Sequence, residues 1–235
     1  MPLTAVQIDQ LYLFTRQHYV EYYDLQTELV DHLAHAIEAQ MKESPTLTFD
    51  EALNLEFQKF GIFGFMDVVE NRQAVLNKKY NGLVWQLFKD FFGFPKIVFT
   101  LVLTLLIFSI LKVSDYKEIV LLSLIGLLFI FSGYSIMQSR RQQKSNREHN
   151  KKKWLFEEII NQYGNFSVIV FVPFNICLQL YTNVRDIFIN DFYLWVLSIV
   201  LVLSAVVLFI LFKTIPAKME DYLRSTYPEY LLEKS

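Results

Sequence analysis

The densest group of residues that can do chemistry lies on one predicted helix near the N-terminus. Glu28 and His32 are four residues apart, as are Asp31 and His35, so in a helix all four share one face with Glu38. Two histidines beside carboxylates are ligand types that a divalent metal ion takes. Histidine in such surroundings also titrates near neutral pH. The spacing therefore raises both a metal site and a pH-sensing site as hypotheses.

The same spacing argues against a zinc hydrolase. In helical zinc proteases a glutamate adjoins one of two histidines that lie four residues apart. His32 and His35 are three residues apart, and neither has a glutamate as its neighbour. We favour a solvated helix face with local Glu–His and Asp–His pairs, which predicts no catalytic residue, no cofactor and no bound metal. His32, His35 and Asp31 remain the candidate metal ligands.

A compact helical domain over residues 1–80 is expected to position this face. The spacing of apolar residues predicts four helices, at 5–19, 25–42, 49–60 and 63–79. Thr4 and Asp24 are suitable N-caps for the first two helices. Thr48 is suitable for the third, where Glu51 completes a capping box.

The run DLQTELVDHLAHAIEAQ, followed by TFDEALNLEFQKFG, resembles the small HAAS-type helical signalling domain of bacterial integral membrane proteins. The positions that carry the resemblance are Glu28, Asp31, His32, Leu33, Glu51, Ala52, Phe60 and Gly61. The resemblance covers about residues 10–75. This chain departs from the family in a longer linker that contains Pro45, and it lacks the usual glycine before the third helix.

The resemblance implies a cytoplasmic helical bundle that makes regulatory protein contacts and has no enzymatic activity. Because such proteins are often encoded beside PadR-type transcription regulators, a transcription regulator or a larger membrane complex is the expected partner. An oligomer is also compatible with the sequence. The predicted protein-contact residues are Glu28, Asp31, His32 and His35.

Four apolar runs follow the domain and predict an all-α protein with a four-helix transmembrane bundle over 97–212. The runs are 97–111, 119–137, 166–181 and 192–212. A bilayer core about 30 Å thick needs roughly 20 mostly apolar residues in a helix. The third run is short for this and carries Pro173, Asn175 and Gln179. These intramembrane polar groups are expected to face other helices.

Lysine and arginine set the predicted orientation. The loop 138–153 is strongly basic, whereas the connections 112–118 and 182–191 hold two and one basic residues. Basic loops stay on the cytoplasmic side. Both termini and the basic loop are therefore expected in the cytoplasm, with the chain in the bacterial inner membrane.

The basic loop is also predicted to contact anionic lipid headgroups. The residues assigned to this contact are Arg140, Arg141, Lys144, Lys151, Lys152 and Lys153. Nucleic acid is not an expected partner, because the run is tethered to the membrane and lacks interleaved aromatic residues.

Amphipathic segments at 81–96 and 151–164 are predicted to lie in the membrane interface. Each follows an Asn-Lys-Lys step and leads into a pair of apolar runs, so duplication of one two-span module is an open interpretation. The tail, 213–235, is expected to dock on the helical domain or on the membrane surface.

Three functions remain open. We favour a regulatory or scaffolding role, without enzymatic activity. The alternative is a small transporter or channel built from two parallel two-span repeats around Pro173, Asn175 and Gln179. No charged residue lies within a predicted span, which counts against ion-coupled transport. The third possibility is a metal-dependent membrane enzyme that uses His32 and His35.

Overall fold

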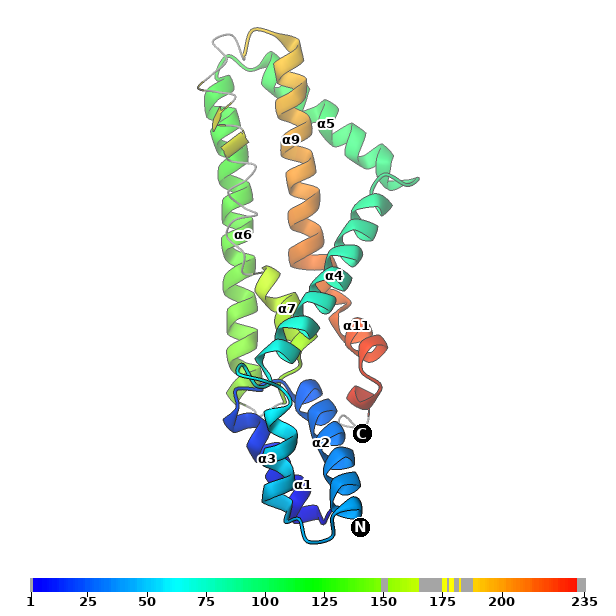
Figure 1. The fold of residues 1–235 in the computed structure, drawn as a ribbon. Helices are drawn as coiled ribbons and strands as arrows, with labels where there is room; N and C mark the ends of the chain where they lie inside the picture. The colour runs from blue at the N-terminus through cyan, green and yellow to red at the C-terminus, as the bar shows by residue number, and fades with distance from the viewer. Residues whose placement is uncertain are drawn as a thin grey trace. The chain divides into compact units, whose positions relative to one another are not determined.

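The computed structural model describes residues 2–148, 152–164, 175–176, 178–179, 182 and 188–231 (Figure 1). Every regular element among these residues is a helix, which confirms the predicted all-α class. The chain divides into two compact units. The first, here called the head, consists of Met1–Lys79, Lys151–Ile159 and Leu223–Ser235. The second, here called the membrane unit, consists of Tyr80–Asn150 and Ile160–Tyr222.

The head begins with three helices, α1 (Ala5–Gln17), α2 (Tyr23–Glu43) and α3 (Phe49–Gln58), and α4 (Met66–Asp90) follows them. Thr4 and Thr48 cap α1 and α3 in capping boxes, the second with Glu51, as predicted. The predicted cap Asp24 is wrong: α2 begins two residues earlier than predicted, at Tyr23, and no side chain caps it. The Asp24 carboxylate instead accepts a hydrogen bond from another helix, described below.

The core of the head is the apolar side of α2. Leu25, Leu29, Leu33 and Ile37 are each at most 3% exposed. They recur at the spacing that places side chains on one side of a helix, and α2 packs against both α1 and α3. The apolar spacing that predicted this helix thus corresponds to its buried side.

Aromatic rings close the head at the turn between α3 and α4. The Phe57 ring lies 5.1 Å from Phe14 and 5.0 Å from Phe65, both edge-on. Gly61 and Gly64 in this turn have positive φ, 74° and 55°. A Cβ at Gly64 would lie 3.0 Å from Phe57 Cζ, whereas a Cβ at Gly61 would meet nothing.

The membrane unit contains α5 (Lys96–Val113), α6 (Lys117–Glu148) and α9 (Asp191–Phe209), and α9 packs against the other two. Three stretches of the described chain are long and apolar enough to cross a membrane, namely Lys96–Val113, Lys117–Arg141 and Asp191–Ala217. They match three of the four predicted spans. The remaining prediction, 166–181, lies outside the described residues except at a few positions.

The helix α9 passes through a π-helical turn, η1 (Ile210–Thr214), into the short α10 (Ile215–Ala217). The Ile215 N–H donates to the Ile210 carbonyl, five residues back. Pro216 has no N–H and would clash with the carbonyl of Phe212 in a regular α-helix. The wider turn accommodates the proline, so the helical stretch continues past the predicted end at residue 212.

Two further boundaries differ from the sequence prediction. The helix α4 continues to Asp90 without the expected break near residue 80, and α6 runs to Glu148, so much of the predicted loop 138–153 is helical. The helix α7 (Leu155–Gly164) forms where an interfacial helix was expected, but its first turn and the preceding Trp154 are buried within the head. Protein, rather than lipid, covers its apolar start. The helix α11 (Met219–Thr226) and the 3₁₀ turn η2 (Pro228–Leu231) complete the described tail.

Replacement of Gly64 by alanine should destabilise the head more than replacement of Gly61. Each change places a Cβ on a left-handed backbone, which costs about 1–2 kcal/mol. Only Gly64→Ala adds a contact with the Phe57 ring. Thermal unfolding of the purified full chain measures both variants. Equal losses for the two would show that the Phe57 contact contributes nothing.

Candidate functional site

The predicted contact residues lie together on the exposed side of α2. Glu28, Asp31, His32 and His35 are all exposed, opposite the buried leucines. Of the two predicted pairs, the structure forms Asp31–His35: the His35 Nδ1 lies 2.8 Å from the Asp31 carbonyl oxygen and 3.4 Å from its Oδ1. The hydrogen bond to the Asp31 backbone and the nearby Asp31 charge raise the pKa of His35.

The other candidate residues are dispersed. Within the described ranges, no group of three or more His, Cys, Asp or Glu side chains is arranged to hold a metal ion. Asn175 and Gln179 lie on helical residues and are exposed, whereas Pro173 falls outside the described residues. Among the residues that the structure describes, His32 is therefore not part of a metal centre.

The basic residues fall into two groups. Arg140, Arg141 and Lys144 lie exposed on the extension of α6. Lys152 and Lys153 contact the head: the Lys152 Nζ lies 3.8 Å from the Tyr23 ring centroid, and the Lys153 Nζ lies 2.6 Å from Glu21 Oε2. Lys151 is outside the described residues. Lipid contact by all six residues stays a prediction.

A buried junction of three chain segments, which the sequence did not reveal, lies beside Tyr23. Asp24 Oδ1 accepts a hydrogen bond from the Leu155 N–H at 3.1 Å. The Tyr227 hydroxyl accepts one from the Phe156 N–H at 3.2 Å. The first N–H groups of a helix have no partner within it. Side chains from two distant segments therefore cap α7.

Aromatic packing surrounds these hydrogen bonds. Trp154 is 3% exposed, and its ring lies 5.4 Å from Tyr23, 4.8 Å from Tyr227 and 5.4 Å from Tyr230. Lys79 donates to Thr226 Oγ1 at 2.8 Å, and its Nζ lies 5.4 Å from the Phe156 ring. We call this set, Asp24, Trp154, Leu155, Phe156 and Tyr227, the three-segment junction. It joins the last part of the tail, from Leu223, to the head, whereas 213–222 belongs to the membrane unit.

Burial shapes the electrostatics of the junction. Desolvation raises the pKa of Asp24, and the hydrogen bond from Leu155, the nearby Tyr227 hydroxyl and the charge of Arg72 oppose this rise only in part. Desolvation and the nearby Asp24 carboxylate also raise the pKa of Tyr227, so its hydroxyl stays protonated and can donate. The junction thus holds a carboxylate that is costly to ionise.

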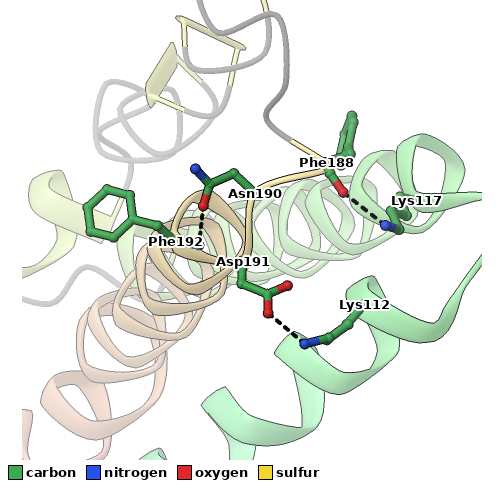
Figure 2. Close-up of polar contacts among 6 residues, drawn as sticks. All are labelled: Lys112, Lys117, Phe188, Asn190, Asp191 and Phe192. Atoms are coloured by element: carbon green, nitrogen blue, oxygen red, sulfur yellow. Dashed lines mark hydrogen bonds and ion pairs between the residues drawn. The ribbon is translucent and has the colours of Figure 1, made fainter.

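A second polar cluster joins the helix ends of the membrane unit (Figure 2). The Lys112 Nζ lies 2.6 Å from Asp191 Oδ2, and the Lys117 Nζ donates to the Phe188 carbonyl at 2.9 Å. Asn190 caps α9 by accepting from the Phe192 N–H. The end of α5 and the starts of α6 and α9 therefore lie at one end of the unit. The predicted orientation places the connections 112–118 and 182–191 on the same side of the membrane, and it therefore requires this arrangement.

Comparison of the chain with models of known families, with curated proteins and with solved structures finds no match.

Two replacements of Asp24 should distinguish its role as a hydrogen-bond acceptor from the effect of its ionisable carboxylate. Asp24→Ala removes the acceptor for the Leu155 N–H and should destabilise the docked α7 start by about 1–3 kcal/mol, the cost of a buried unpaired donor. Asp24→Asn keeps an acceptor oxygen and should lose less. Hydrogen exchange of the Leu155 and Phe156 amides in the full chain measures the docking.

The raised pKa of Asp24 also predicts the direction in which the stability of the junction changes with pH. Because the pKa of Asp24 is raised in the folded head, its contribution to stability is fully present below the ordinary pKa of aspartate. That contribution is lost as the pH rises through the raised value. Protection of the two amides, corrected for intrinsic exchange, should fall over this range in the wild type and stay flat in Asp24→Asn. The same decline in both would exclude Asp24 as its source.

Proposed function

We propose that the chain is a multi-pass protein of the bacterial cytoplasmic membrane that acts in regulation or scaffolding, through protein contacts of its head. One observation carries this proposal. The charged side of α2 is exposed, while the opposite side of the same helix forms the core of the head. A helix fixed in this way presents Glu28, Asp31, His32 and His35 as a preformed polar surface.

The resemblance to HAAS-type signalling domains fits this division. Its polar positions Glu28, Asp31 and His32 are exposed, whereas Leu33 and Ala52 are buried. The apolar part of the pattern thus accounts for the fold of the head. Its polar part contributes nothing to the core, which favours a role in recognition. A transcription regulator or a larger membrane complex is the partner that this resemblance supports.

We further infer a fourth crossing of the membrane, which completes the expected topology. Two contacts hold the starts of α6 and α9 at the same end: the Lys117–Phe188 hydrogen bond and the Lys112–Asp191 ion pair. The α6 span of 25 residues carries the chain away from that end by about 38 Å, at 1.5 Å per residue. The chain therefore has to cross back before Phe188, which leaves both termini on the cytoplasmic side.

The topology is testable with single cysteines in a Cys177→Ser background. A cysteine at Ser114 or at Asn190 should react with a membrane-impermeant maleimide added to intact cells. A cysteine at Ser235 should react only after the membrane is opened. Labelling of Ser114→Cys without labelling of Asn190→Cys would contradict the fourth crossing.

The contact surface is testable by site-specific photo-crosslinking in cells. A photoreactive residue at His32 should yield a discrete adduct, and the companion change Asp31→Ala should reduce that adduct several-fold. A photoreactive residue at Gln10, exposed on α1, is the matched control and should yield none. Adducts of equal strength at both positions would show that the α2 surface is not a specific contact.

A further inference from the structure

Aromatic side chains form a ladder over the last part of α4 and the turn that follows it. The Trp85 and Phe88 rings are stacked with centroids 5.7 Å apart, and Phe88 lies edge-on to Phe92 at 5.1 Å. Residues three and four apart share one side of a helix. The ladder nevertheless remains open on its outer side, because Trp85 is 57% exposed and Phe92 is 47% exposed.

Two lysines flank the ladder. The Lys89 Nζ lies 5.3 Å from the Trp85 ring centroid, and the Lys96 Nζ lies 5.0 Å from the Phe91 ring. Both lysines are exposed. The cations therefore lie over aromatic rings while they keep room for an anionic partner.

The aromatic surface is continuous with the membrane spans. The inner ring, Phe91, lies 6.3 Å from Phe209 of α9 and so attaches the end of α4 to that helix. Lys96 is the first residue of the α5 span. Phe94 and Phe99, on either side of it, are 87% and 67% exposed. Lipid covers the apolar surface of a membrane-spanning helix, and this surface passes without a break into the ladder.

The far end of α9 contributes to the same region. Lys112 and Asp191 pair the end of α5 with the start of α9, so the two helices run antiparallel. The end of α9 therefore lies near the start of α5, as the Phe91–Phe209 contact also shows. Lys213, exposed in the π-helical turn, brings a third positive charge to this end.

We propose that this end of the membrane unit binds the headgroups of anionic phospholipids, with Trp85, Phe92 and Phe94 in the bilayer interface and Lys89, Lys96 and Lys213 on lipid phosphates. Indole and phenyl rings beside lysine are suited to the headgroup layer. Each lysine near an anionic leaflet adds attraction. The proposal rests on the membrane spans and is independent of the role proposed for the head.

The basic segment that precedes α7 is a different surface. Its Lys153 is paired with Glu21, and its Lys152 lies over Tyr23, both within the head. They belong to the head, where lipid contact is a separate prediction, so changing them controls for a general loss of positive charge rather than for its loss beside Trp85.

Tryptophan fluorescence of the full chain in lipid nanodiscs tests the proposal. The wild-type signal minus that of Trp85→Phe isolates Trp85 from the other two tryptophans. Phosphatidylcholine lipids brominated near the headgroup should quench most of this difference signal, and aqueous iodide should quench little of it. Added phosphatidylglycerol should shift the Trp85 emission to shorter wavelength. Lys89→Gln with Lys96→Gln should abolish that shift, while Lys152→Gln with Lys153→Gln should leave it.

Three results would overturn the proposal. Quenching by iodide alone would place Trp85 in water. If Trp85 is protected from both quenchers, and this protection is lost when each nanodisc holds a single chain, then a second copy of the chain covers this surface. An emission shift that survives in the Lys89 and Lys96 variant would show that these lysines do not recognise the anionic lipid. Failure of the photo-crosslinking at His32 would bear on none of these outcomes.

Discussion

The head depends on one constraint: the buried N–H groups in the first turn of α7 need hydrogen-bond acceptors. The residues before this turn are lysines and Trp154, whose side chains donate hydrogen bonds but cannot accept them. No side chain immediately before the helix can therefore accept from the buried N–H groups of Leu155 and Phe156, and an unpaired buried donor costs about 1–3 kcal/mol. Asp24 and Tyr227 supply the acceptors from segments 131 and 71 residues away. The head is consequently assembled from three parts of the chain.

That assembly encloses the membrane unit within the sequence of the head. The stretches Tyr80–Asn150 and Ile160–Tyr222 are each flanked on both sides by segments of the head. The entropy of closing such loops grows only slowly with their length, so the long separations are not a large penalty. The long separations do impose an order of folding. The contacts among α1, α2 and α3 are local, whereas the junction needs Tyr227, near the end of the chain. The core around Leu29 and Leu33 can form before the junction is complete.

The sequence predicted those features whose cause is local. The capping box of Thr48 and Glu51 spans three residues, and three spans follow from uninterrupted apolar composition. The Asp24 prediction was wrong because the rule that assigns an aspartate to its own helix cannot detect a helix start elsewhere in the chain. An amphipathic pattern likewise shows that one side of a helix will be covered but does not identify what covers it. The start of α7 is covered by protein, while the similar aromatic side of α4 is left exposed at Trp85.

The free energies of the individual contacts show which of them holds the junction together. The Lys153–Glu21 pair has side chains 44% and 67% exposed, and exposed ion pairs contribute only about 0–1 kcal/mol. A tryptophan buries roughly 150–250 Å², so nearly complete burial of Trp154 contributes up to about 4–6 kcal/mol at roughly 25 cal/mol per Å². Apolar burial therefore supplies the stability, and the Asp24 and Tyr227 hydrogen bonds fix the register at which α7 begins. The lysines before Trp154 orient the segment, and salt that screens them should leave the junction intact.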